Sequence, residues 1–460
     1  MSSSRADDLL YAKILVASMG AAAVVRRFKS PETRWRLCAA FGVALVALVC
    51  RWQLLYSLCM VAGNLILYKT VAKRNLGLSS FVFSFGYLTV FRCNPLLPFA
   101  MEAVYPHANA VQLIMTLRCV GLAFELSDSA DDQSESKFAH RRLLPHETGT
   151  FHLACYLYNF AGLFTGPYYT YRVHRDVAMV GDPSAVPIAQ ELAPRLAVLP
   201  GFVLLFLLVI ALFPLNALHT DEFYAAHGFV YCFLYMVPTF LYLRTRIYIA
   251  WMLAESTCVV AAIGAYPAAT KPKVGLGPTL PLAAQHARNS ERSVLVDERI
   301  QEWSFETIRN VDAYGCEFSD GFRSAMHCWN ASVQYWLASC VYRRLPKSVR
   351  MPLTMLVSAF WHGIHPGYYL SFLTIPLCTY AEDLMKATFD VTNHEQHKIR
   401  PLVWWFVRAR GLDFMACGFL LLSFGSTIRY WRSIGFCLHV TMLACILVCH
   451  AKRWADKKRA

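Results

Sequence analysis

Charged residues are scarce in this sequence: they make up 16% of its 460 residues, whereas hydrophobic residues make up 56%. Soluble domains carry roughly a quarter charged residues, so this deficit argues against a soluble protein. Apolar runs recur instead, and residues 196–213 form an 18-residue stretch without any charge. Such a run approaches the ~20 residues that cross ~30 Å of hydrocarbon as a helix.

We predict an all-α integral membrane protein, a multi-pass helical bundle with about 11 transmembrane segments, because backbone in hydrocarbon must satisfy its own hydrogen bonds. One long apolar stretch, 37–68, is expected to make two passes that are separated at Arg51. The expected segments are 9–25, 37–68, 78–90, 111–126, 151–164, 196–213, 229–241, 247–265, 325–341, 353–384, 402–424 and 434–449.

Several signatures of other protein classes are missing. The 16 cysteines contain no CxxC pair, so neither a zinc site nor a thioredoxin-like motif is indicated. We expect free thiols that pack as small hydrophobic side chains, no metal and no bound cofactor. The sequence also lacks a Gly-x-Ser-x-Gly elbow, a Walker loop, a Rossmann glycine fingerprint and a histidine with an aspartate five positions later. An internal repeat, the signature of many transporters, is missing as well.

The positive charge has a simple explanation in a membrane protein. A net charge of +14 would suggest nucleic acid as the partner of a soluble domain. Cytosolic loops of membrane proteins collect Lys and Arg, however, so we predict the lipid bilayer as partner and no nucleic acid. Two clusters are expected on the cytosolic side, one formed by Arg26, Arg27, Lys29, Arg34 and Arg36 and the other by Arg343, Arg344, Lys347 and Arg350.

We expect one membrane-embedded domain over residues 1–460. Two polar stretches interrupt it, about 127–150 and about 266–320. Part of the second, 302–312, mixes apolar and charged residues and favours an amphipathic helix at the membrane surface. The residues that could carry chemistry follow in the core region 321–384.

His362 lies inside an apolar segment, where ionisable residues are costly and usually line a cavity or polar path. Taken alone, a neutral histidine bonded to a neighbouring helix explains it equally well. Its segment, 353–384, would measure ~48 Å as one straight helix, which predicts a break near Pro366-Gly367. Broken backbone is tolerated at membrane depth where it lines a cavity. A cavity that holds His362 and His365 is therefore our candidate active site.

Asn330 is the second unusual residue of the core region. A buried amide must find a partner, which another helix could supply, and Asn330-Ala331-Ser332 also reads as a glycosylation sequon. The spacing suggests more, because Asn330 lies about 17 residues before Lys347 and His362 about 15 residues after it. In antiparallel helices both side chains would reach a similar depth, ~22–25 Å from the turn.

This pair suits acyl transfer. A neutral histidine can take the proton of an attacking hydroxyl, and an asparagine amide can donate to the acyl oxygen or orient the histidine. Arg343 and Arg344 would suit the phosphates of an acyl-coenzyme A, although a positive-inside loop explains them equally well. The predicted catalytic residues are His362 and Asn330, and the predicted substrate-binding residues are Trp329, Trp361, His365, Tyr368, Arg343 and Arg344.

At these two segments the sequence resembles the membrane-bound O-acyltransferase family, whose signature is an asparagine on one transmembrane segment and a histidine about thirty residues later in another apolar segment. Further motifs resemble its lysophosphatidylinositol acyltransferase branch, and together they extend over most of the chain. They are Phe164-Thr-Gly-Pro-Tyr-Tyr-Thr-Tyr-Arg172, Arg246-Ile-Tyr-Ile-Ala-Trp251, Gly264-Ala-Tyr-Pro267, Glu306-Thr-Ile-Arg-Asn310, His365-Pro-Gly-Tyr-Tyr-Leu-Ser-Phe-Leu-Thr-Ile-Pro-Leu377 and Thr427-Ile-Arg-Tyr-Trp431.

The resemblance implies transfer of an acyl group from acyl-coenzyme A, a co-substrate, to the sn-2 hydroxyl of lysophosphatidylinositol. It also implies a polyunsaturated, typically arachidonoyl, chain and residence in the endoplasmic reticulum membrane, with which the lysines of Lys457-Lys458-Arg459-Ala460 agree as a dilysine signal. A basic stop-transfer flank explains these lysines equally well. The alternatives are a family member with another lysophospholipid, a sterol or a protein as acceptor and, from another class, a proton-coupled transporter.

Overall fold

The computed structural model describes residues 5–93, 104–130, 143, 148–280, 302–389 and 399–459. Regular structure in these ranges is almost entirely helical, as the apolar pattern predicted. Within them, five stretches are long and apolar enough to cross a membrane, and a bent pair of helices near the C-terminus would make a sixth. The protein is thus a helical, multi-pass membrane protein, and the figure of about 11 crossings stays a prediction.

The described chain forms two compact units. Unit 1 consists of Met1–Leu199, Ala250–Asn310 and Ala331–Cys340, and unit 2 of Pro200–Ile249, Val311–Asn330 and Val341–Ala460. Every residue that we singled out for catalysis or substrate binding belongs to unit 2. The single membrane-embedded domain expected from the sequence stays a prediction.

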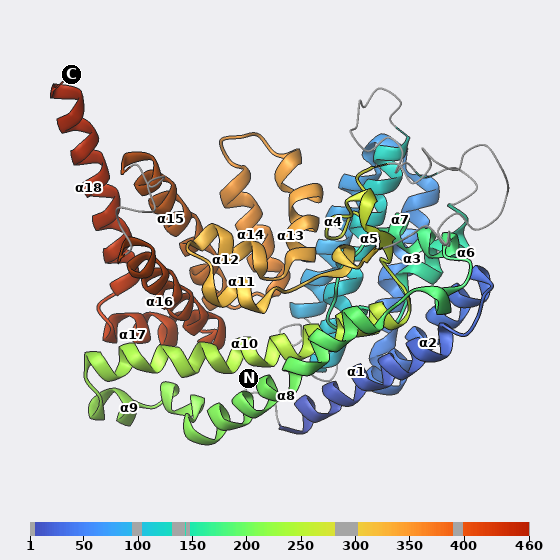
Figure 1. Ribbon diagram of the computed structural model, residues 1–460, viewed down its shortest axis with the longest axis horizontal. Coiled ribbons are helices and arrows are strands. Elements are labelled where there is room, and N and C mark those ends of the chain that lie inside the picture. The colour runs from blue at the N-terminus through green and yellow to red at the C-terminus, as the bar shows by residue number, and fades with distance from the viewer. Residues whose placement is uncertain are drawn as a thin grey trace. The chain divides into compact units, whose positions relative to one another are not determined.

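The first five long helices all belong to unit 1. Within this group α4 packs on α5, and α3 packs on both (Figure 1). Arg51, whose φ is 51°, ends α2 and starts the 3-10 turn η1 (Arg51–Gln53), so the helix is broken at this arginine, and the two separate passes expected there stay a prediction. The helices are α1 (Arg5–Val25), α2 (Pro31–Cys50), α3 (Leu54–Thr70), α4 (Lys73–Cys93) and α5 (Pro106–Ser129).

No single helix covers the crossing expected over 151–164, because α6 (Thr150–Leu157) ends after two turns. The reason is Arg118 of α5, which is 1% exposed. Its guanidinium donates to the carbonyls of Tyr156, Leu157, Asn159 and Ala161 at 2.6–3.3 Å. Carbonyls at a helix end need such donors when they are buried. A single arginine therefore ends α6 and holds the turn that follows.

Basic residues in the turn between α1 and α2 and in the first turn of α2 bind a later segment of unit 1. Arg26 donates to the carbonyl of Val186 at 2.6 Å, and the buried Arg34 donates to that of Val180 at 2.8 Å. Lys29 pairs with Asp182 at 2.9 Å and, with Ser184, lowers the pKa of that carboxyl to about 2. These cations thus fix the fold, and their cytosolic location stays a prediction.

The remaining elements of unit 1 are short, apart from the parts of α8 (Ala189–Leu212) and α10 (Phe229–Val260) that it contains.

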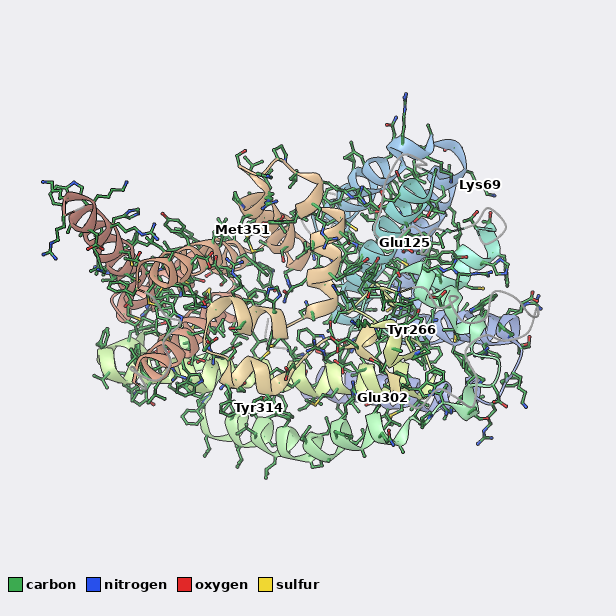
Figure 2. All side chains as sticks on the ribbon, turned by 45° about the horizontal axis from the view of Figure 1, so that its top comes forward. Lys69, Glu125, Tyr266, Glu302, Tyr314 and Met351 are labelled. Atoms are coloured by element: carbon green, nitrogen blue, oxygen red, sulfur yellow. The ribbon has the colours of Figure 1, made fainter. Side chains whose placement is uncertain are left out.

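The prediction of an amphipathic helix over 302–312 is wrong. Strand β2 (Trp303–Ser304) pairs there with β1 (Tyr266–Pro267), and a 3-10 turn follows. Figure 2 labels Tyr266 and Glu302 in these segments. The others are α7 (Tyr171–Asp176), η5 (Val177–Met179), η6 (Pro183–Ala185), η8 (Ala268–Thr270), η9 (Glu306–Ile308) and α13 (Ala331–Cys340).

Unit 2 is built around α15, which packs against α14, α16 and α18 (Figure 1). Its apolar core includes Phe414, Tyr430 and Trp431, each at most 2% exposed. The elements are η7 (Leu215–His219), α9 (Asp221–Ala226), α11 (Ala313–Phe318), α12 (Phe322–Cys328), η10 (Tyr342–Arg344), α14 (Arg350–His362), α15 (Pro366–Thr388), α16 (Ile399–Leu421), α17 (Phe424–Ser433) and α18 (Cys437–Arg459), together with parts of α8 and α10.

Helix α10 corrects another expectation, since one helix of 32 residues replaces the two predicted segments 229–241 and 247–265. Arg244 lies in the gap between these two predicted segments. In unit 2, however, Arg244 pairs with Glu317 of α11 at 3.2 Å. Because the charge is paired, the helix continues through it.

Candidate active site

The predicted helix break beside His362 is confirmed. Helix α14 ends at His362, residues 363–365 are not helical, and α15 begins at Pro366. Proline fits the first turn of a helix because it lacks the N–H that would have no partner there. It also keeps the preceding residue out of the helical region, and His365 is extended, with φ −70° and ψ 131°. The sequence Pro366-Gly367 therefore places His362 at a helix end.

Close packing of two backbone segments requires a glycine directly after this proline, at position 367. Its N–H donates to the carbonyl of Leu422 at 2.7 Å, which ties the start of α15 to the end of α16. A Cβ at this position would lie 2.2 Å from the backbone oxygen of Gly418. Ser371, one turn later, adds a hydrogen bond to the carbonyl of Met415 at 2.7 Å. Close backbone approach thus fixes the break.

The imidazole of His362 is surrounded by aromatic rings. Phe372 of α15 stacks on it with ring centroids 5.2 Å apart, and Phe419 of α16 meets it edge-on at 5.0 Å. Trp361 lies at 4.7 Å and Tyr368 at 6.0 Å. The imidazole is half-buried, so this cage confines the ring while leaving part of it accessible.

Two residues of this cage were missed by the sequence analysis. Phe372 lies four residues after Tyr368, on the same face of α15, and this spacing was a usable signal once a helix start at Pro366 was expected. Phe419 is far along the chain on α16, and no local pattern connects it to His362. Tyr368 also contacts Phe419, with centroids 4.7 Å apart, and closes the cage on that side.

Asn330 lies in a helix break, whereas the sequence predicted an unbroken apolar segment over 325–341. Helix α12 ends at Cys328 and α13 begins at Ala331. Asn330 has a φ of 49°, in the left-handed region. Asparagine adopts this region more readily than other residues with a side chain, apart from aspartate. The backbone here therefore favours asparagine independently of any chemistry.

Trp329, the residue before Asn330, packs in unit 2 against α10. Its ring lies 5.7 Å from that of Tyr248 and 6.0 Å from that of Phe240. The Tyr248 hydroxyl donates to Glu317 at 3.0 Å, and Glu317 pairs with Arg244. Tyr248, which is itself hydrogen-bonded, and Phe240 thus hold the ring next to Asn330.

The eight predicted site residues fall into three groups by their described contacts. Trp361, His362, His365 and Tyr368 form one, since the His365 ring lies 6.0 Å from Tyr368. Trp329 and Asn330 occupy the break between α12 and α13. Arg343 and Arg344 are exposed on η10. Figure 2 labels Met351, on the first turn of the helix that ends at His362. The matched depth of Asn330 and His362 stays a prediction.

The glycosylation alternative for Asn330 can be compared with the structure, and the described residues can be searched for a metal site. Among the described residues, no group of three His, Cys, Asp or Glu side chains could hold a metal ion. The serine of the sequon, Ser332, is fully buried and its hydroxyl is hydrogen-bonded inside unit 1. This burial disfavours glycosylation, which needs an accessible sequon. The arrangement suits a general base in an apolar site.

The family model for MBOAT, the membrane-bound O-acyltransferase family, matches residues 103–425. A membrane-bound acylglycerophosphatidylinositol O-acyltransferase from Xenopus laevis is 40% identical over 453 residues, which cover 96% of this chain and 93% of the relative. The proteins of the same name from Homo sapiens and Caenorhabditis elegans are 37% and 35% identical, over 96% and 94% of this chain and 93% and 92% of their own lengths.

These matches extend over both units and include Asn330 and His362. The sequence similarity extends along nearly the full length of each relative. The structure agrees with it, since the chain has a helical membrane fold and a histidine in an aromatic cage at a helix end. The chain therefore belongs to the membrane-bound O-acyltransferase family and is an acyltransferase.

Proposed function

We propose that this acyltransferase moves a polyunsaturated acyl group, arachidonoyl in our prediction, from acyl-coenzyme A to the sn-2 hydroxyl of lysophosphatidylinositol. The acceptor is supported by the relatives named above, which carry acylglycerophosphatidylinositol O-acyltransferase in their names and align along almost the whole chain. The observation that carries the chemistry is His362, held by aromatic rings at the end of α14.

In the proposed reaction, His362 takes the proton of the sn-2 hydroxyl. The oxygen attacks the thioester carbonyl, so an O–C bond forms while the carbonyl electrons move onto the acyl oxygen. Collapse of this tetrahedral intermediate breaks the C–S bond. The coenzyme A sulfur then receives the proton from His362, and the histidine is neutral again. The products are a diacyl phospholipid and free coenzyme A.

Asn330 is the proposed donor toward the acyl oxygen. Its N–H group would stabilise the charge that develops there, and one such donor contributes about 10²–10³ in rate. The left-handed backbone of Asn330 and the packing of Trp329 on Tyr248 support a fixed direction for this amide. A donor needs such preorganisation to act on a transition state.

The remaining assignments concern the substrates and the membrane. Trp329, Trp361, His365 and Tyr368 are proposed to bind the substrates around the reacting atoms. Exposed arginines on η10, Arg343 and Arg344, are proposed to hold the phosphates of acyl-coenzyme A. Residence in the endoplasmic reticulum membrane is proposed on the family resemblance.

The test offers the purified protein four lysophospholipids, with inositol, choline, serine or ethanolamine head groups, and arachidonoyl-coenzyme A or palmitoyl-coenzyme A. We expect the fastest turnover with the inositol acceptor and the arachidonoyl donor. Equal rates across the head groups would remove the acceptor assignment, and equal rates for the two donors would remove the acyl preference. Substitution of both Arg343 and Arg344 by alanine should raise KM for the donor and leave KM for the acceptor unchanged.

A further inference from the structure

Asn310 acts on Asn330 indirectly, because it binds residues that are next to Asn330 in the chain. It follows η9 in unit 1 and is 1% exposed. Its carbonyl accepts from the N–H of Ala331 at 2.8 Å. Its side-chain Oδ1 accepts from Ser332 twice, from the hydroxyl at 2.5 Å and from the N–H at 3.3 Å. Asn310 therefore binds the two residues that directly follow Asn330.

These contacts replace a helix cap. Ala331 and Ser332 are the first two residues of α13, and their N–H groups have no partner inside the helix. A side chain of the residue before a helix usually accepts such bonds. Here the acceptor comes from position 310, so a distant segment determines where α13 begins and how the chain enters it.

Asn310 is itself fixed by charged and backbone groups. Its N–H donates to Glu255 of α10 at 2.7 Å, and Glu255 is 2% exposed. The other carboxylate oxygen of Glu255 accepts from Arg195 at 3.1 Å. On the far side, the Ser332 hydroxyl accepts from the N–H of Tyr168 at 2.9 Å. The result is a buried chain of hydrogen bonds within unit 1.

The segment before Asn330 is held as well. In unit 2 the N–H of Asp312, two residues after Asn310, donates to the carbonyl of Cys328 at 2.9 Å. Asp312 also starts α11, because its carboxylate accepts from the N–H of Gly315 at 2.9 Å. The chain is thus fixed both before and after the left-handed residue, which restricts the direction of its side chain.

We infer that Asn310 is a positioning residue for acyl transfer: by binding the backbone of Ala331 and Ser332, it fixes Asn330 in its left-handed conformation. The inference rests on the proposed role of Asn330 in the reaction. It also assigns a role to two of the family-like motifs that contain neither Asn330 nor His362. Asn310 is the last residue of the motif 306–310, and Tyr168 lies in the motif 164–172. Both meet at Ser332.

The test uses an isosteric pair at Ser332. Ser332→Thr keeps the hydroxyl, and Ser332→Val has the same added volume without it, so crowding in this buried position affects both equally. Misplacement of a catalytic group by about 1 Å costs about 10²-fold in rate. We therefore expect kcat of Ser332→Val to fall about 10- to 100-fold below that of Ser332→Thr. KM for arachidonoyl-coenzyme A and for lysophosphatidylinositol should agree within about twofold, because the substrates still bind.

Turnover is normalised to the monodisperse protein recovered by size exclusion, so that loss of folded enzyme does not count as loss of kcat. Equal kcat values for the two Ser332 variants would overturn the inference. If crowding prevents both variants from folding, Asn310→Asp and Asn310→Leu give the same comparison, since only Asp keeps an acceptor. Leu should then have the lower kcat, and equal values would again overturn it.

Asn330→Ala in the same assay separates this inference from the proposed function. Wild-type turnover of Asn330→Ala would remove the catalytic role of Asn330, and the positioning role with it. Loss of turnover in Asn330→Ala together with equal kcat for Ser332→Thr and Ser332→Val would overturn the positioning role alone.

Discussion

Replacement of Asn330 by glycine, aspartate or alanine separates the two contributions of this residue, its left-handed backbone and its side-chain amide. The φ of 49° costs glycine nothing, whereas alanine loses about 1–2 kcal/mol in the left-handed region. Aspartate tolerates this region and has the shape of asparagine, but it offers an oxygen where the amide offers N–H.

We therefore expect stability and turnover to vary independently in this series. Alanine should lower the free energy of unfolding by about 1 kcal/mol relative to glycine, because only alanine is strained at this φ. Turnover should fall about 10²–10³-fold in all three variants, because each lacks the donor toward the acyl oxygen. Aspartate keeps the shape of asparagine but replaces the donor by an ionisable oxygen, so its loss of turnover combines the missing donor with an added negative charge, and glycine is the variant that removes the donor alone.

The assay measures single-turnover acyl transfer from arachidonoyl-coenzyme A to lysophosphatidylinositol, together with thermal unfolding of each variant in the same detergent. Wild-type turnover in Asn330→Gly would refute the reasoning, because the amide would then be dispensable. An inactive Asn330→Ala beside a fully active Asn330→Gly would show that only the backbone conformation matters.

Three further substitutions test the framework of the site. Gly367→Ala should destabilise the folded protein by about 1–3 kcal/mol, because the added Cβ would lie 2.2 Å from a backbone oxygen. Gly425→Ala is the matched control, because a Cβ there has nothing within 4 Å. Equal melting temperatures for the two variants would contradict the argument. Arg118→Met should abolish monodisperse protein, because several buried carbonyls lose their donor at about 1–3 kcal/mol each; a well-folded variant would show that the turn after α6 is held otherwise. Phe419→Ala should lower kcat more than it raises either KM, because His362 loses its edge-on neighbour, and unchanged kcat would remove the confining role of this ring.

A local signal predicted one helix break correctly. A proline followed by glycine, inside a segment too long for one crossing, predicted the break beside His362, and the structure has it between His362 and Pro366. Proline acts on its own neighbours, so its effect is readable in the sequence. The need for glycine at position 367 cannot be predicted from the sequence, because it arises from the close approach of the α16 backbone.

Distant partners caused the wrong predictions. The stretch 151–164 has the composition of a crossing, but Arg118 of another helix binds the carbonyls at its middle. The sequence predicted two segments on either side of Arg244, whereas one helix runs through this residue, whose charge is paired with that of Glu317. In each case the deciding group lies far away in the sequence, where hydropathy and periodicity carry no information about it.

The catalytic candidates show the same division. His362 could be singled out because an ionisable residue in an apolar run is unusual. The cage around it is only partly local, since Phe372 follows from helical spacing and Phe419 does not. Asn330 was found by its chemistry but placed in a helix. Its left-handed conformation depends on contacts made by residues such as Ala331, whose partner Asn310 is remote.

The role of His362 as the base is tested most directly by single-turnover acyl transfer with His362→Gln, purified beside His327→Gln as the control. Glutamine keeps a polar side chain but cannot take the proton of the hydroxyl, whereas His327 is exposed on α12. The account predicts that His362→Gln transfers arachidonoyl to lysophosphatidylinositol about 10²–10⁴-fold more slowly than the wild type. It predicts an unchanged rate for His327→Gln and the same melting temperature for both. A folded His362→Gln with the wild-type rate would contradict it.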